Sequence, residues 1–65
     1  MNNANAQKLA DDLVRSMYGG FDLATLEELA EIGAKAEAES PLPEVKMMNA
    51  AIHREIERRK TEAQL

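Results

Sequence analysis

The sequence predicts an all-α protein of three helices, the second and third of which form an antiparallel hairpin. Apolar residues recur at the three- and four-residue spacing that places side chains on one face of a helix. Two breaks interrupt this pattern: the dipeptide Gly19-Gly20 and the segment 40–43, which contains both prolines of the chain. Oppositely charged residues four positions apart, such as Glu55 and Arg59, form the pairs that support an exposed helix.

The first helix is expected over residues 4–18. Its apolar residues follow one helical face, and the charged residues Asp11 and Arg15 lie on the opposite face. We expect Gly19 and Gly20 to end the helix, because glycine adopts the left-handed backbone conformation at little cost. The apolar face consists of Ala6, Leu9, Ala10, Leu13, Val14 and Met17.

The second helix is expected over residues 22–39. The carboxylate of Asp22 can cap the free amides of the first turn, although Thr25 with Glu28 offers a competing capping box. Gly33 lies on the predicted packing face, where it costs roughly 1 kcal/mol of helix stability relative to alanine. We therefore expect Gly33 to allow the close approach of another helix. The other residues of this face are Leu23, Leu26, Leu29, Ala30 and Ala36.

The third helix is expected over residues 43–62. Pro43 suits its first position, where the missing amide hydrogen removes no helical bond. The apolar stripe of this helix consists of Val45, Met48, Ile52 and Ile56. Beyond Ile56 the stripe meets Arg59, so we expect the last two turns to be exposed or to contact something outside the chain.

The size of the chain predicts self-association. Sixty-five residues form one domain, residues 1–65, near the lower limit at which a single core stabilises a fold. Much of the apolar content is alanine, so the core buries a modest area per residue. Three apolar stripes exceed what one such chain can cover, and we expect a homodimer. The residues expected to pack in the core or at the dimer interface are Leu26, Leu29, Gly33, Val45, Met48, Ile52 and Ile56.

The sequence offers little that could perform chemistry. It contains no cysteine and one histidine, His53, with Glu57 one turn away. A single histidine with scattered carboxylates supplies neither a catalytic set nor convergent metal ligands. We therefore expect no enzymatic activity, no cofactor and no metal. The lack of cysteine and of a long apolar stretch favours a cytoplasmic protein without a membrane span.

Charge is unevenly distributed in this chain, whose net charge is −4. The second predicted helix is strongly acidic, whereas the end of the third is rich in arginine. These charges are interpreted either as a solvated surface or as a recognition surface. In the second interpretation arginine pairs with carboxylates of a larger protein, and methionine adapts to its apolar groups. The residues expected to bind this partner are Met47, Arg54, Arg58 and Arg59.

One resemblance implies nucleic-acid binding. Residues 25–32 resemble the opening helix of helix-turn-helix domains, in which an alanine such as Ala30 packs at the helix crossing. Ala34 stands where that motif carries its turn glycine. The resemblance implies a DNA-binding regulator that uses the third helix. Because the net negative charge opposes phosphate binding, DNA binding is the alternative function.

Two further resemblances imply regulation of another protein. The hairpin, with Pro43-Glu44-Val45 opening its last helix, resembles the small two-helix phosphatases that act on aspartyl phosphates in the sporulation phosphorelay. Residues 49–53 stand where that family carries its Ser-Gln-Glu-Leu-Asp signature, with the apolar position retained. In size, acidity and helical content the chain also resembles small phage-type anti-activators that dimerise and sequester transcription factors. The function expected first is a non-enzymatic regulatory protein that binds and inhibits a larger protein.

Overall fold

The computed structural model describes residues 3–64, and this part of the chain folds into three helices without a strand. Helix α1 spans Asn3–Tyr18, α2 spans Leu23–Glu39 and α3 spans Pro43–Ala63. The all-α prediction is confirmed, and every predicted helix boundary lies within one residue of the observed one. None of the three helices is both long enough and apolar enough to cross a membrane.

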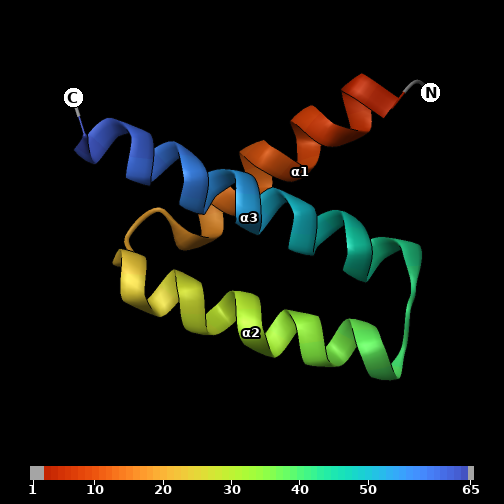
Figure 1. Cartoon of the computed structure of the whole chain (residues 1–65). Coiled ribbons are helices and arrows are strands. Elements are labelled where there is room, and N and C mark those ends of the chain that lie inside the picture. Colours follow the sequence, from red (N-terminus) through yellow and green to blue (C-terminus); the bar gives the residue numbers. More distant parts are fainter. Residues whose placement is uncertain (1–2, 65) are drawn as a thin grey trace.

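Helix α3 is the central element of the fold. Both α1 and α2 pack mainly against α3 rather than against each other. In Figure 1, α2 runs along the lower edge, α3 returns above it, and α1 crosses behind α3. The sequence left open whether the first helix packs on its own hairpin or on a partner subunit, and in the structure it packs on α3 of its own chain.

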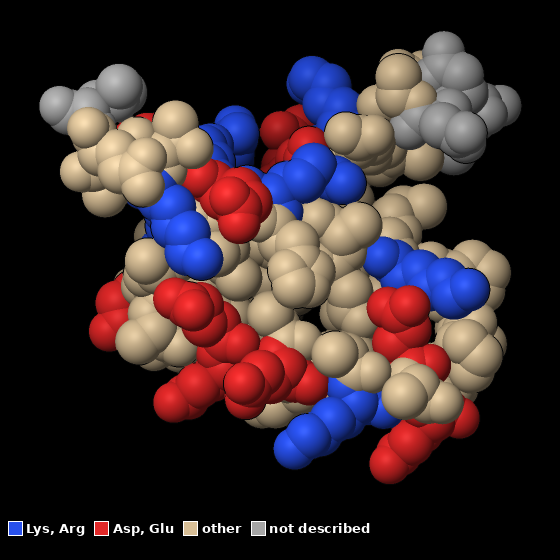
Figure 2. All heavy atoms as spheres, viewed as in Figure 1, with Lys and Arg blue, Asp and Glu red and all other residues tan. Residues whose placement is uncertain are grey.

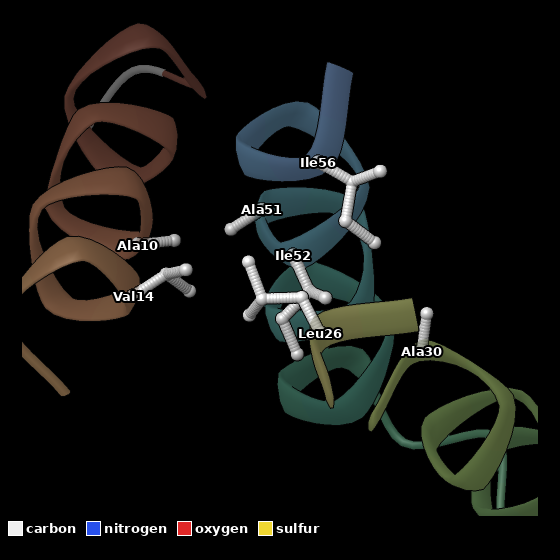
Figure 3. Close-up of a cluster of buried hydrophobic side chains, with 7 residues drawn as sticks. All are labelled: Ala10, Val14, Leu26, Ala30, Ala51, Ile52 and Ile56. Carbon is white, nitrogen blue, oxygen red and sulfur yellow. The ribbon is translucent and has the colours of Figure 1, made fainter. Parts of the chain in front are cut away.

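The core is small and rich in alanine. Leu26 and Val14 are its largest fully buried side chains. Figure 3 shows residues from α1, α2 and α3 converging in this cluster, which consists of Ala10, Val14, Leu26, Ala30, Ala51, Ile52 and Ile56. Among the other residues expected to pack, Leu29 and Met48 lie partly buried against this cluster, and Val45 and Gly33 are half-buried.

The apolar face of α1 is only half used within the chain. Ala10 and Val14 are buried against α3, whereas Leu9, Leu13 and Met17 are 63%, 48% and 52% exposed. Helix α1 packs mainly on α3, and it does so through its smaller apolar residues. The larger apolar residues of the same face lie beside this contact and stay exposed. Part of the leftover apolar surface that the sequence suggested therefore lies on α1.

Side chains define the start of the two later helices. Oδ1 of Asp22 accepts a hydrogen bond from the backbone amide of Thr25 at 2.8 Å, which caps α2 as predicted. The Thr25 side chain and, to a smaller extent, its backbone amide hold the pKa of Asp22 below its usual value by hydrogen bonding to the carboxylate. Pro43 occupies the first position of α3, where its missing amide hydrogen is tolerated.

The end of α1 differs from the prediction. None of the three glycines, all within the described residues, has a positive φ, so no left-handed residue closes the helix. Gly19 is required for space instead, because a Cβ there would lie 2.5 Å from the carbonyl oxygen of Arg15. The amide of Phe21 donates to the carbonyl oxygen of Tyr18 at 3.0 Å. Further donors come from Arg59 on α3, and these take the place of a glycine cap.

Gly33 marks a close approach between α2 and α3. A Cβ at this position would lie 2.2 Å from Oδ1 of Asn49 and 3.0 Å from its Cγ. The buried side chain of Asn49 donates through Nδ2 to the carbonyl oxygen of Gly33 at 2.8 Å and to Oε1 of Glu37 at 2.9 Å. The absence of a side chain at Gly33 thus makes room for a polar group that joins the two helices.

Candidate functional site

The basic end of α3 surrounds a buried carboxylate. The side chain of Glu55 is 4% exposed and lies among three arginines, Arg15 of α1 and Arg58 and Arg59 of α3. Nε of Arg58 donates to Oε1 of Glu55 at 3.1 Å, and Nε of Arg59 donates to Oε2 at 3.0 Å. Nε of Arg15 lies 3.5 Å from Oε1. We call these four residues the Glu55 cluster.

These contacts shift the ionisation of the Glu55 cluster. The hydrogen bond from Arg58, together with a weaker contribution from Arg59, lowers the pKa of Glu55 to about 2 against the opposing effect of burial. The same bond to Glu55 raises the pKa of Arg58. The carboxylate is therefore ionised and fully engaged at neutral pH, which suits it to holding helices together rather than to proton transfer.

Arg59 also binds the end of α1. Nη2 of Arg59 donates to the carbonyl oxygens of Tyr18 at 3.1 Å and Gly19 at 3.3 Å, and Nη1 donates to that of Phe21. The last carbonyls of a helix lack partners within the helix and carry partial negative charge, which a guanidinium compensates. The sequence predicts that the last two turns of α3 are exposed or contact something outside the chain. Residues 60–64 are exposed, but Arg59 is half-buried and binds the end of α1 within the same chain.

The other predicted partner-binding residues lie along one side of α3. Nη2 of Arg54 lies 2.8 Å from Oδ1 of Asp11 on α1, and Arg58 also pairs with Glu62 at 2.6 Å. Met47 is exposed one turn after the start of the helix. Because Met47, Arg54 and Arg58 are separated by seven and four residues, they share one side of α3, and we call them the α3 row. Arg59 is turned away from this row towards α1.

Apolar surface forms a second feature, which lies beside the first turns of α3. A hollow of about 350 Å³ separates α1 from the start of α3. A second hollow, of about 340 Å³, lies between α2 and α3. Both hollows are lined by Glu44 and Met48, so they adjoin at the start of α3, and we call the two together the apolar groove. Its main apolar residues are Leu9, Leu13, Leu29, Ile32, Val45, Met47 and Met48.

A third hollow carries several charged side chains on its lining. It has a volume of about 330 Å³ and contains His53 with Glu27, Glu31 and Glu57 on its lining. Figure 2 shows acidic side chains gathered along α2 at the lower edge of the molecule, in keeping with the acidic second helix of the sequence. Within residues 3–64, no three histidine or carboxylate side chains stand close enough together to hold a metal ion.

Two buried polar residues that join the helices, Glu55 and Asn49, are not identified from the sequence. The charge pattern places Glu55 in an exposed pair with Arg59, yet Glu55 is buried. Asn49 carries no signal of its own, yet it is buried and links α2 to α3. The spacing could have revealed both, because each lies three residues from Ile52 and hence beside the apolar stripe.

The segments that carry the resemblances are placed as follows. Residues 25–32 lie in the first half of α2, and that helix continues to Glu39 without a turn near Ala34. In the segment 49–53, Ala51 and Ile52 belong to the core, and His53 is exposed. Comparison with known protein families, with characterised proteins and with solved structures finds no match to this chain.

Proposed function

We propose that this chain is a small, non-enzymatic regulatory protein that binds a larger protein, such as a transcriptional regulator, and inhibits it. The α2–α3 pair serves as an antiparallel hairpin that presents the binding surface, and the protein acts as a homodimer. Binding is favoured over catalysis because the buried ionisable side chain of the Glu55 cluster is committed to internal ion pairs.

The observation that carries this proposal is the α3 row. Met47 is 43% exposed, and the side chains of Arg54 and Arg58 are 38% and 37% exposed. Carboxylates of the same chain already fix both guanidinium groups, so less side-chain freedom is lost when a partner binds their outer edges. An adaptable methionine beside two positioned arginines suits a partner surface with an apolar patch and carboxylates.

The test compares two double variants of α3 by capture from a lysate of the source cell. Arg54→Ala with Arg58→Ala removes two charges from the row, and Lys46→Ala with Lys60→Ala removes two charges from exposed positions elsewhere on α3. Alanine is used because glutamate at either arginine would face Asp11 or Glu55. Because Arg58 also bonds the buried Glu55, circular dichroism first checks that the arginine variant keeps the wild-type helicity, and Arg54→Ala alone replaces it if it does not. We expect one protein to be retained by the wild type and the lysine variant, and at least tenfold less of it by the arginine variant.

The captured protein is then purified, and its activity is measured with each variant added. Inhibition by the wild type and the lysine variant, but not by the arginine variant, supports the proposal. Equal capture by all three proteins would show that the α3 row is not the binding surface. Salt-sensitive retention of nucleic acid in place of a protein would favour the DNA-binding alternative.

A further inference from the structure

The exposed area of the chain is larger than that of a compact monomer. A protein of 7.2 kDa is expected to expose about 4,100 Å² from the scaling of surface with mass. This chain exposes 4759 Å². The excess, roughly 650 Å², approaches the ~800 Å² per partner that a stable interface of standard size buries. The area left uncovered is thus about what one more copy of the chain would cover.

The apolar groove has the shape that a symmetric dimer needs. Leu9, Leu13 and Met17 recur every fourth residue on α1 and form an exposed ridge, and the first two also line the groove. A two-fold interface uses the same surface on both copies, so that surface must contain both a projection and a matching hollow. Here the hollow beside the α1 ridge and the hollow beside α2 share Glu44 and Met48 in their lining, so a projection and a hollow adjoin at the start of α3.

The charges around the groove also favour an identical partner. Glu44 is the one charged residue among the described residues that line it, and the acidic side chains of α2 such as Glu27 and Glu31 line a different hollow. Two copies that met through an acidic surface would repel each other, whereas an almost uncharged surface can meet its own copy. A partner recognised by charge would find little to pair with in this groove.

We propose that the apolar groove is the homodimer interface, with the α1 ridge of each copy seated in the groove of the other. Leu13 of one copy then packs against Ile32 of its partner, and the two-fold axis repeats the contact. This inference rests on the homodimer of the proposed function and adds the surface that forms it. It leaves Arg54 and Arg58 of the α3 row outside the interface, where each copy can present them to a target, whereas Met47 lines the groove and lies at the border of the two surfaces.

The first experiment follows molar mass against concentration by analytical ultracentrifugation. The wild type is expected to have twice the chain mass at micromolar concentration. Leu13→Glu and Ile32→Glu should each raise the dimer dissociation constant roughly 100-fold, because each buries a carboxylate without a partner. Both residues are exposed in the protomer, 48% and 64%, so helicity should be unchanged. Ala34→Glu, on another side of α2, is the matched control and should remain a dimer.

The second experiment tests the pairing of ridge and groove. Leu13→Glu protein is mixed with Ile32→Lys protein, each of which should be monomeric alone. In the mixed dimer one contact joins the introduced carboxylate to the introduced ammonium, and the other joins the native Leu13 to the native Ile32. A heterodimer with an affinity at least tenfold above that of either variant alone supports the inference.

The failures of the two proposals are distinguishable. A wild type that stays monomeric across the concentration range overturns the homodimer, whatever the α3 row binds. A wild-type dimer that persists in both Leu13→Glu and Ile32→Glu overturns the groove as its interface. Two monomeric variants that do not form a heterodimer overturn the seating of the α1 ridge in the partner's groove.

Discussion

The two sides of α3 hold their neighbouring helices by different means. On the α1 side, the apolar contact is thin, and charge does much of the joining: Arg54 pairs with Asp11, and Arg59 binds the last carbonyls of α1. On the α2 side, Leu26 and Ala30 pack on the isoleucines of α3, and the polar link runs through the uncharged amide of Asn49. One interface therefore depends on ionisation, and the other depends on side-chain volume.

This difference follows from the residues that α1 and α2 offer. An interface formed by Ala10, Val14 and Ala51 buries little apolar area, so specific polar bonds contribute a larger share of its stability. Leu26 is fully buried at the α2 interface, so apolar burial contributes a larger share of the stability there. The arginines of α3 are consequently structural on their α1 side and available for binding on their outer side.

The largest expected effect is on the charged interface. Arg59→Ala should reduce the free energy of unfolding by about 3 kcal/mol, because it leaves the buried carboxylate of Glu55 with fewer partners and removes the donor shared by the carbonyls of Tyr18, Gly19 and Phe21. Lys60→Ala removes the neighbouring, exposed charge and should change stability by less than about 0.5 kcal/mol. Urea unfolding monitored by circular dichroism measures both. Equal free energies of unfolding for the two variants would contradict the inference that charged groups hold α1 against α3.

Acid should weaken the same interface. The pKa of Glu55 is about 2 in the folded chain, against 4.5 when the carboxyl group is free. A lowered folded pKa contributes stability that is fully present above pH 4.5 and is lost as the pH falls towards 2. The contribution is on the order of 3 kcal/mol.

Thermal melts between pH 6 and pH 2 test this expectation. The wild type should lose stability steeply below pH 4.5. Glu55→Gln should be less stable than the wild type at pH 7 and should show a shallower decline, because its side chain does not titrate. A decline of the same steepness in both proteins would place the acid-sensitive groups elsewhere.

The helices could be predicted from the sequence because their signals are local. Asp22 and Pro43 mark helix starts by their own chemistry, and the apolar stripe of α3 identifies Ile52 and Ile56 as core residues. Such features depend on residues three or four positions apart, which a single sequence displays directly. The helix boundaries accordingly agree closely with the prediction.

The roles of the charged residues could not be predicted in the same way. In the sequence, Glu55 and Arg59 are four residues apart, which predicts an exposed ion pair. This spacing gives no indication that the end of α1 lies beside them. The glycine cap expected at Gly19 failed for the same reason, since the donors that replace it come from forty residues further along the chain. Contacts between helices depend on how the helices cross, and a helical repeat does not encode the crossing.

The smallest of these effects is expected at the uncharged interface and tests its dependence on volume. Gly33→Ala should lower the free energy of unfolding by about 1–3 kcal/mol, because the new Cβ displaces the buried amide of Asn49 from its two hydrogen bonds. Gly20→Ala is the matched control: its Cβ would meet nothing within 4 Å, so it should be neutral or slightly stabilising.

Asn49→Ala alone should also destabilise the protein, through loss of the bonds to Gly33 and Glu37. Combined with Gly33→Ala, however, it removes the group that the new Cβ strikes, so the double variant should be more stable than the sum of the single effects implies. Urea unfolding measures the free energies of unfolding of the single and double variants. If the two single effects add up to the effect of the double variant, Gly33 and Asn49 act independently. The close approach of α2 to α3 then does not limit the size of the side chain at position 33.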